Sequence, residues 1–134
     1  MLIIGHRGCD LYMENTIKAF QKALDIGCHM IELDIQFTKD KQIIVFHDII
    51  CDILLPIKGL ISSKNYNELK IYNIPLLKDI LDKFNKNKLY IEFKNNFNTE
   101  FFELTMKLLK NYNNENIYLA SFNYDYFIKL LNYK

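Results

Sequence analysis

The feature that most constrains the fold of this chain is a regular alternation of short apolar runs with longer amphipathic segments. Each run has the length of one strand, and each segment repeats apolar residues three or four positions apart, as on one face of a helix. The runs lie at 2–4, 30–37, 43–46, 89–93 and 117–120, and the helical segments at 16–26, 76–84, 99–112 and 124–133. Because strands that alternate with helices form mainly parallel sheets, the sequence predicts an α/β layer or barrel.

One connection in this pattern is too short for a parallel crossover. Parallel neighbours need about a dozen connecting residues, whereas residues 38–42 are all that separate the second run from the third. These two runs are therefore predicted to form a hairpin that turns near Lys39 and sets His47 opposite roughly Glu32. The segment that follows, 49–75, is the least regular part of the pattern.

Length and composition indicate a single globular domain spanning 1–134. Half of the 134 residues are apolar and a quarter are charged, and the chain has no internal repeat or low-complexity linker. Its net charge of +1 comes without a basic block, so nucleic acid is not an expected partner. Three cysteines without paired spacing, no secretory signal and no run of transmembrane length predict a soluble, cytoplasmic protein.

Unusual polar residues gather where the predicted strands end. In parallel α/β folds the loops at the C-terminal ends of the strands form the working face, so these side chains are predicted to face one region. In chain order they are His6 and Arg7 after the first strand, Glu32 and Asp34 on the second, His47 at the end of the third, Glu92 and Lys94 on the fourth, and Ser121 to Asn123 after the fifth.

Three of these residues are carboxylates whose common direction indicates a cation site. Along 30–37, apolar residues alternate with Glu32 and Asp34, which places both carboxylates on one face of the strand. Glu92 is predicted to point to the same region, and a cluster of oxygen ligands suits Mg²⁺ or Ca²⁺ better than zinc. The alternative is a solvent-facing strand face, which is common. In a barrel the same face would be interior, where buried carboxylates need a cation.

Two histidines and two basic residues complete the predicted site. Histidine titrates near neutral pH, so His6 and His47 are candidates for general acid and general base. Arg7 and Lys94 are placed to hold an anionic group, which favours phosphoryl chemistry. The alternative for each histidine is a packed residue without a catalytic role, which is also the prediction for His29. The sequence has no glycine-rich phosphate loop and no G-x-S-x-G nucleophile elbow.

These residues lie in motifs that together resemble the glycerophosphodiester phosphodiesterase family, a branch of the phospholipase-C-like phosphodiesterases. The matching motifs are GHRG, ENT, IELDIQFTKD, VFHD, IPLLKDIL, IEFK and SFN, in this order over residues 3–123. The resemblance implies a TIM-type (β/α) barrel. It also implies a metal-dependent hydrolase of lipid metabolism that converts glycerophosphodiesters to glycerol 3-phosphate and an alcohol.

The resemblance further implies a role for each matching residue. It makes His6 and His47 the catalytic acid and base, and it places Arg7 and Lys94 on the phosphate of the substrate. A divalent metal, Mg²⁺ or Ca²⁺, would be bound by Glu32, Asp34 and Glu92. Further candidates for the site, which lie in the same motifs, are Glu14, Asn15, Ser121 and Asn123.

Length sets this chain apart from the barrel that the resemblance implies. Eight-stranded barrels typically take about 250 residues, whereas this chain of 134 residues carries about five of the eight strands, so the barrel is expected to be truncated. Residues 49–56 also differ from the segment that usually follows the His-Asp motif in the family, which leaves the head group open. One interpretation is a homo-oligomer in which copies complete the barrel, and another is that the sequence is a fragment of a longer chain. The alternatives to this enzyme are a non-catalytic remnant that binds phosphate and metal, and a phospholipase-D-like activity on lysolipids.

Overall fold

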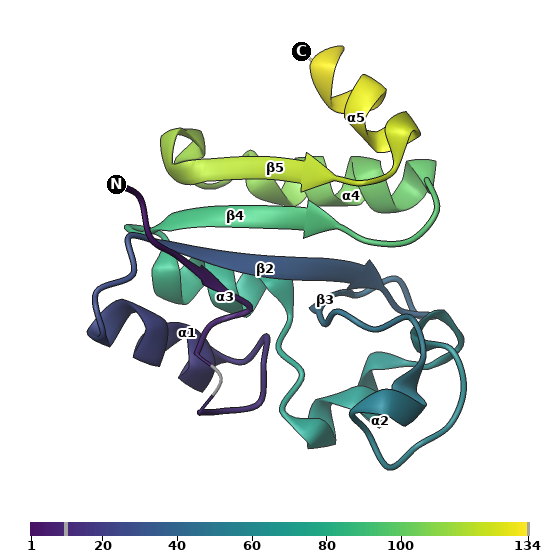
Figure 1. Cartoon of the computed structure of the whole chain (residues 1–134). Coiled ribbons are helices and arrows are strands. Elements are labelled where there is room, and N and C mark those ends of the chain that lie inside the picture. Colours follow the sequence, from purple (N-terminus) through teal and green to yellow (C-terminus); the bar gives the residue numbers. More distant parts are fainter. Residues whose placement is uncertain (10, 134) are drawn as a thin grey trace.

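The strands of this protein form one sheet with a parallel main path. The computed structural model describes residues 1–9 and 11–133, and five strands lie in this part, in the order β1-β2-β4-β5 with β3 beside β2 (Figure 1). Neighbours on the main path are parallel, and β3 is antiparallel to β2. The strands are β1 (Ile4–His6), β2 (Met30–Phe37), β3 (Ile43–Val45), β4 (Lys88–Phe93) and β5 (Ile117–Ser121).

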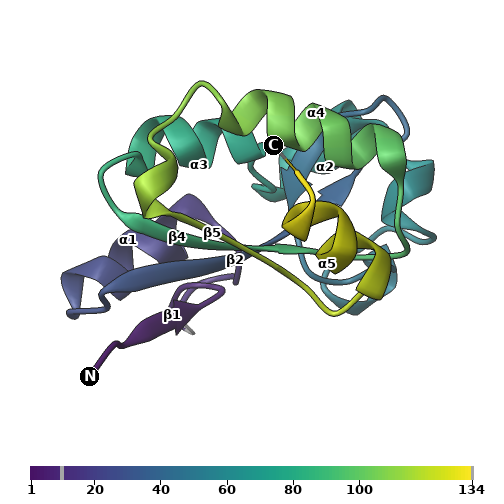
Figure 2. The same ribbon diagram turned by 90° about the horizontal axis from the view of Figure 1, so that it is seen from above.

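Helices cover one face of this sheet, with α3 and α4 stacked above it in the view from the top (Figure 2). The helices are α1 (Ile17–Asp25), α2 (Tyr66–Leu69), α3 (Leu77–Phe84), α4 (Thr99–Leu109) and α5 (Tyr124–Leu131), and short 3₁₀ helices lie at Cys51–Ile53, Ile61–Ser63, Lys70–Tyr72 and Asn114–Asn116. Side-chain oxygens cap the N-termini of α1, α4 and α5, where Thr16 accepts the amide of Ala19, Asn98 accepts that of Phe101 and Asn123 accepts that of Asp125. None of the helices in the described part is long and apolar enough to cross a bilayer.

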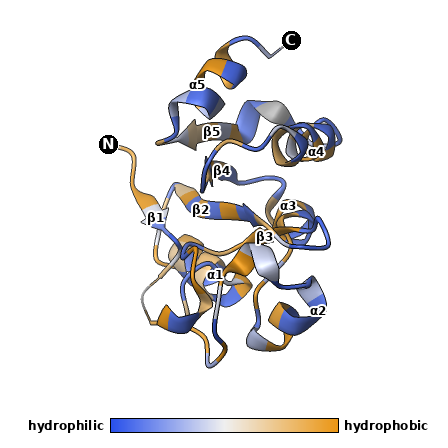
Figure 3. Ribbon diagram, turned by 90° about the vertical axis from the view of Figure 1, so that its right-hand side faces the viewer, coloured by the Kyte–Doolittle hydropathy of each residue, from blue (hydrophilic) through white to orange (hydrophobic). Residues whose placement is uncertain are grey.

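The main apolar core fills the space between the sheet and these helices. Ile31, Leu33 and Ile35 of β2 are completely buried in it, and the apolar and polar bands that alternate along β2 are visible in Figure 3. Aromatic rings join α5 to the same core, where Phe93 of β4 stacks on Tyr126 with ring centroids 4.9 Å apart. The opposite face of the sheet, which we call the inner face, therefore carries the polar residues of β2.

The predicted hairpin is confirmed by the antiparallel pairing of β2 with β3. Its ladder ends where Val45 faces Ile35, two residues before His47. The segment after the hairpin, predicted to be irregular, packs as a second, smaller core around Ile44, Cys51 and other residues of this part of the chain: Phe46, Leu55, Ile61, Leu69 and Ile74.

The ends of several elements differ from the sequence prediction. The first strand begins at Ile4 and not at residue 2, because β2 begins at Met30, which faces Ile4. As a result His6 is the last residue of the strand itself. α4 ends at Leu109 and α5 at Leu131, a few residues before the predicted ends.

The predicted α/β fold with a mainly parallel sheet is confirmed. Of the five strands in the described residues, four lie on the parallel path and β3 stands off it. Four parallel strands with helices on one face correspond to half of an eight-stranded (β/α) barrel. The C-terminal ends of these strands, where the polar residues gather, lie along one border of the sheet.

Candidate active site

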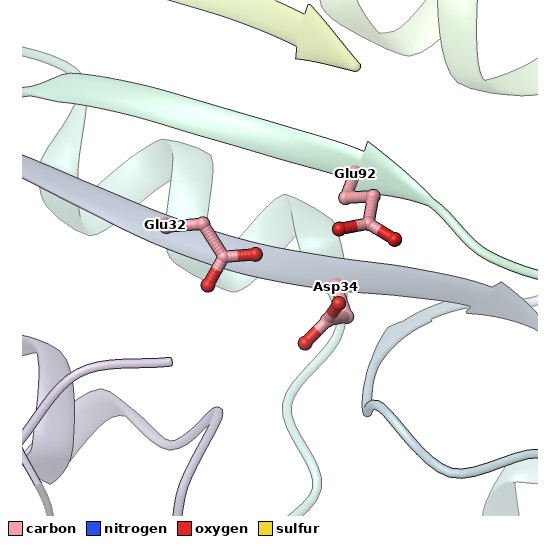
Figure 4. A group of neighbouring side chains, drawn as sticks. All are labelled: Glu32, Asp34 and Glu92. Carbon is pink, nitrogen blue, oxygen red and sulfur yellow. The ribbon is translucent and has the colours of Figure 1, made fainter. Parts of the chain in front are cut away.

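The inner face of the sheet carries an acidic cluster formed by Glu32, Asp34 and Glu92 (Figure 4). Glu32 and Asp34 are alternate residues of β2, and the strand register sets Asp34 beside Glu92 of β4. One carboxylate oxygen of each residue lies within 4.8 Å of one from each of the other two. Because Glu32 and Asp34 are only 5% and 1% exposed, the alternative of a solvent-facing strand face is wrong.

Two basic side chains contact this cluster. The ammonium of Lys94 lies 2.9 Å from Glu92 Oε1 and 3.7 Å from Asp34 Oδ1. Arg7 Nε lies 3.3 Å from Asp34 Oδ2, and Arg7 Nη1 donates to both carboxylate oxygens of Glu14 at 3.1 and 3.3 Å. The candidates for holding an anion, Arg7 and Lys94, are thus brought to the acidic cluster, and Glu14 joins them.

The loop after β1 reaches the cluster through unusual backbone geometry. Arg7 and Asn15 are non-glycine residues with left-handed φ angles of 55° and 57°, which are uncommon and are often found at functional sites. The Asn15 amide donates to Asp34 Oδ2 at 2.9 Å, and its oxygen accepts the Asp34 backbone N–H at 3.2 Å. Gly8 permits this path, because a Cβ there would lie 2.6 Å from the Cβ of Ala19.

Glu32 is the carboxylate whose environment is least favourable to its charge. Burial and the nearby charges of Asp34 and Glu92 raise the pKa of Glu32 to about 7, although the Arg7 amide, which donates to Glu32 Oε2 at 2.8 Å, opposes the shift. A bound cation would remove this penalty, because it favours the ionised form.

The two candidate catalytic histidines come from different strands and differ in exposure. His6 ends β1 beside Glu32, its Nε2 lies 3.9 Å from Glu32 Oε2, and its side chain is 70% exposed. His47 follows β3, and its Nδ1 lies 2.8 Å from Asp48 Oδ1. Since an ionised carboxylate can only accept, Asp48 keeps the proton on Nδ1 and leaves Nε2 of His47 for other partners. His29 instead accepts the amide of Ile3, as expected of a structural residue.

A polar network that the sequence did not predict supports the His47 segment. Gln36, which is fully buried, donates through Nε2 to the carbonyls of Phe46 and Asp48, at 2.8 Å each. Its Oε1 accepts the side chain of Asn95 at 3.0 Å. Gln36 therefore ties the loop after β4 to the residues on both sides of His47. The signal in the sequence was its position, two residues after Asp34 on the same face of β2.

A cavity of about 580 Å³ opens beside this network, at the C-terminal ends of β2 and β4. Gln36 and Asn95 form one part of its wall, and Thr38, Lys39 and Ser62 add polar groups. Phe37, Ile49, Phe97 and Phe101 also line it, so the cavity combines apolar walls with a few polar groups, as sites for small molecules commonly do.

Ser121 and Asn123 take part in the connection between β5 and α5. Ser121 Oγ donates to the Phe93 carbonyl at 3.1 Å and accepts the amide of Asn123 at 3.0 Å. Asn123 caps α5 by accepting the amides of Asp125 and Tyr126. The contacts of both side chains thus belong to a strand–helix corner, whereas Asn15 contacts the acidic cluster directly.

The donor set of the acidic cluster fits a hard divalent cation. Mg²⁺ and Ca²⁺ bind carboxylate oxygens at about 2.0–2.6 Å, and oxygens within 4.8 Å of one another can surround a single ion of this size. The environment of Glu32 supports the same assignment, because Arg7 and Lys94 already contact Asp34 and Glu92, whereas burial and like charges disfavour the charge of Glu32.

Fold and site together define a class of parallel (β/α) proteins. Its members carry an acidic, oxygen-rich cluster and basic side chains that can hold an anion at the C-terminal ends of the strands. Within that class the family is shown by direct comparison. The model of the glycerophosphoryl diester phosphodiesterase family matches residues 6–132. The chain belongs to this family.

Individual relatives agree with this assignment. The uncharacterised protein YqiK of Bacillus subtilis is 33% identical over 92% of this chain and 58% of its own length, and human lysophospholipase D GDPD1 is 34% identical over 85% and 42%. The crystal structure of a glycerophosphodiester phosphodiesterase from Thermotoga maritima superimposes with a TM-score of 0.85 and 27% identity, covering 100% of this chain and 60% of that one. The chain thus spans about half the length of the relatives it matches.

Proposed function

We propose that this chain acts as a metal-dependent phosphodiesterase that hydrolyses glycerophosphodiesters to glycerol 3-phosphate and an alcohol. The observation that carries the proposal is the cluster of the buried Glu32 and Asp34 with the half-buried Glu92, which Arg7 and Lys94 contact. Membership in the family and the name of the Thermotoga maritima relative support the same reaction.

The roles of the basic residues follow from their positions. Arg7 and Lys94 would hold the phosphate of the substrate, because a guanidinium and an ammonium are the natural partners of its oxygens. The carboxylates of Glu32, Asp34 and Glu92 would hold the divalent metal. When bound, that ion would stabilise the negative charge that builds up on the phosphate oxygens.

The histidines would move the protons. One of His6 and His47 would take the proton from a glycerol hydroxyl as this oxygen bonds to phosphorus, and the other would protonate the departing alcohol. Water would then open the cyclic phosphate with the proton transfers reversed, so that one water is consumed for each diester. The contact of Asp48 with Nδ1 would hold the ring of His47 in the tautomer that exposes Nε2.

Release of choline or ethanolamine from the matching glycerophosphodiesters tests this proposal. We expect turnover that EDTA abolishes and that added Mg²⁺ or Ca²⁺ restores. His6→Gln and His47→Gln should each lower turnover by about 100-fold or more. His29→Gln is the matched control, since the His29 ring accepts the backbone amide of Ile3 and lies just before the start of β2.

Absence of metal-dependent turnover at high enzyme concentration would contradict the enzymatic proposal. Retained binding of glycerol 3-phosphate and metal under those conditions would favour a binding protein of the same family. Equal losses in His29→Gln and in the other two histidine variants would contradict the assigned roles.

A second candidate substrate is a lysophospholipid. The human relative, 34% identical to this chain, bears the name lysophospholipase D, and the two substrates share a glycerol phosphodiester. The same choline-release assay with lysophosphatidylcholine distinguishes the two, because a preference for the acylated substrate would assign a lysolipid activity.

A further inference from the structure

The two oxygens of each carboxylate in the acidic cluster are used differently. In Glu32, Oε2 accepts the backbone N–H of Arg7 at 2.8 Å, and His6 Nε2 lies 3.9 Å from the same oxygen. Both contacts thus fall on Oε2 and leave Oε1 for another partner. Because hydrogen bonds orient the side chains that bind a metal, this division decides how Glu32 can meet a cation.

Asp34 and Glu92 show the same division. Asp34 Oδ2 accepts the side-chain amide of Asn15 at 2.9 Å and lies 3.3 Å from Arg7 Nε. Glu92 Oε1 accepts the ammonium of Lys94 at 2.9 Å. Each carboxylate of the cluster therefore has one oxygen held by a donor of the protein.

The second oxygen of each carboxylate is available to a cation. Glu32 Oε1, Asp34 Oδ1 and Glu92 Oε2 accept no hydrogen bond from the described residues, 1–9 and 11–133. The ammonium of Lys94, at 3.7 Å from Asp34 Oδ1, lies beyond hydrogen-bonding distance. None of these oxygens is among the buried atoms without a partner in that part of the chain, so each keeps open surface. The cluster in Figure 4 can thus give a cation one oxygen from each carboxylate.

The number of oxygens that a carboxylate offers distinguishes Mg²⁺ from Ca²⁺. Ca²⁺ takes about six to eight oxygen ligands and commonly binds both oxygens of a carboxylate, whereas the smaller Mg²⁺ is octahedral and keeps several waters. To bind Ca²⁺ through both oxygens, Asp34 or Glu92 would have to give up its hydrogen bond to Asn15 or Lys94. Single oxygens from three carboxylates therefore suit Mg²⁺ better.

We propose that the acidic cluster selects Mg²⁺ over Ca²⁺, because Arg7, Asn15 and Lys94 each hold one oxygen of a carboxylate and prevent it from binding through both. The inference rests on the cation site of the proposed function and concerns which ion that site takes. Asn15 and Lys94 act here as positioning residues, through Asp34 and Glu92. The donor to Glu32 is a backbone N–H, so no substitution of the Arg7 side chain removes it.

Isothermal titration calorimetry with Mg²⁺ alone and with Ca²⁺ alone tests the proposal on the metal-free chain without substrate. We expect the wild-type chain to have the lower dissociation constant for Mg²⁺. Lys94→Met frees Glu92 Oε1, and Asn15→Gly removes the amide from Asp34 Oδ2 while glycine tolerates the left-handed φ of 57° at this position. Each variant should shift the ratio of the two dissociation constants toward Ca²⁺ by about tenfold or more.

The ratio isolates the number of coordinating oxygens from the change in charge. Loss of the Lys94 ammonium affects both ions alike, because they carry the same charge, and so leaves the ratio unchanged. Lys41→Met is the matched control, since Lys41 also pairs with a carboxylate, that of the exposed Glu100 outside the cluster, at 2.6 Å. We expect this variant to keep the wild-type ratio.

Each outcome of this experiment decides the proposal. Far-UV circular dichroism establishes that a variant is folded, and if one is not, the other variant and the wild-type affinities decide. Tighter binding of Mg²⁺ by the wild-type chain, with a shift toward Ca²⁺ in Lys94→Met and Asn15→Gly but not in Lys41→Met, supports the proposal. Tighter binding of Ca²⁺ by the wild-type chain, no binding of either ion, an unchanged ratio in the folded variants, or an equal shift in Lys41→Met would overturn it.

The outcome is also separate from that of the hydrolase proposal, because turnover is not measured. Selective binding of Mg²⁺ by a chain that releases no choline or ethanolamine would contradict only the hydrolase. Metal-dependent hydrolysis by a chain that prefers Ca²⁺ would contradict only the present inference.

Discussion

The two faces of β2 are equally buried but are stabilised in opposite ways. On one face Ile31, Leu33 and Ile35 have no exposed surface and contact apolar side chains from the helices. On the other face the alternate residues are polar and are also buried: Glu32, Asp34 and Gln36. The apolar face needs partners of the right shape, whereas each oxygen and nitrogen of the polar face needs a partner of the right charge or hydrogen-bonding type.

This difference shows how the site is built into the fold. Asp34 is satisfied by Asn15 and lies between Arg7 and Lys94, and Gln36 makes three hydrogen bonds. Glu32 is the exception, since like charges and burial dominate its surroundings. The polar face is therefore a buried polar network with one unbalanced charge, that of Glu32, and this is where a cation would act.

Leu33→Ala tests the apolar face and should have the largest effect on stability. Leu33 is completely buried among other apolar residues, so its truncation leaves a cavity and should lower the free energy of unfolding by about 2–5 kcal/mol. Urea denaturation at fixed protein concentration measures the change. Leu11→Ala is the control, because Leu11 is exposed and its truncation should change stability by less than about 0.5 kcal/mol. Similar losses of stability in the two variants would contradict the conclusion that the apolar face of β2 is tightly packed.

The unbalanced charge of Glu32 predicts a pH dependence of stability in the metal-free chain. Below pH 4.5, the ordinary pKa of the group, Glu32 is protonated in both the folded and the unfolded state. Between there and about pH 7 the unfolded chain loses this proton while the folded chain keeps it, so stability falls as the pH rises. The full loss is on the order of 3 kcal/mol, since one pKa unit corresponds to about 1.4 kcal/mol.

Two comparisons isolate this contribution in unfolding curves recorded across the same pH range. Glu32→Gln should flatten the slope, whereas Glu103→Gln, at an exposed position, should leave it unchanged. Saturating Ca²⁺ or Mg²⁺ should also flatten the slope, because a cation bound to the cluster favours ionised Glu32. A slope that persists in Glu32→Gln would place the unbalanced charge on another residue.

The sequence was sufficient to predict the side of β2 on which chemistry could occur. Alternation from Met30 to Phe37 separated the two faces, and the short connection to Ile43 identified the hairpin. Both signals are local, since they depend on the two-residue repeat of a strand and on the length of one turn.

What the sequence could not supply depends on contacts between distant segments. The burial of Asp34 requires the loop carrying Arg7 and Asn15 to fold over it in left-handed backbone conformations. The role of Gln36 requires Asn95, which lies far along the chain at the end of β4. The position of Gln36 on the polar face of β2 could be predicted, but its distant partner could not, so this support for His47 became evident only with the strands assembled.

Gln36→Leu tests the polar face at its best-satisfied residue and should have the smallest effect of the three changes. Leucine fills the same space but leaves the carbonyls of Phe46 and Asp48 and the amide of Asn95 without their partner. A loss of about 1–3 kcal/mol in the free energy of unfolding is expected, because buried polar groups that lose a hydrogen bond retain their desolvation penalty. Gln21→Leu, on the exposed face of α1, is the matched control.

A double-mutant cycle distinguishes a connected network from independent contacts. Combined with Asn95→Ala, Gln36→Leu should cost less than the sum of the single changes, with a coupling of about 0.5–3 kcal/mol. Strict additivity would show that Gln36 and Asn95 stabilise their segments separately. The loop after β4 would then have no influence on His47, and the polar face of β2 would be stabilised by independent contacts.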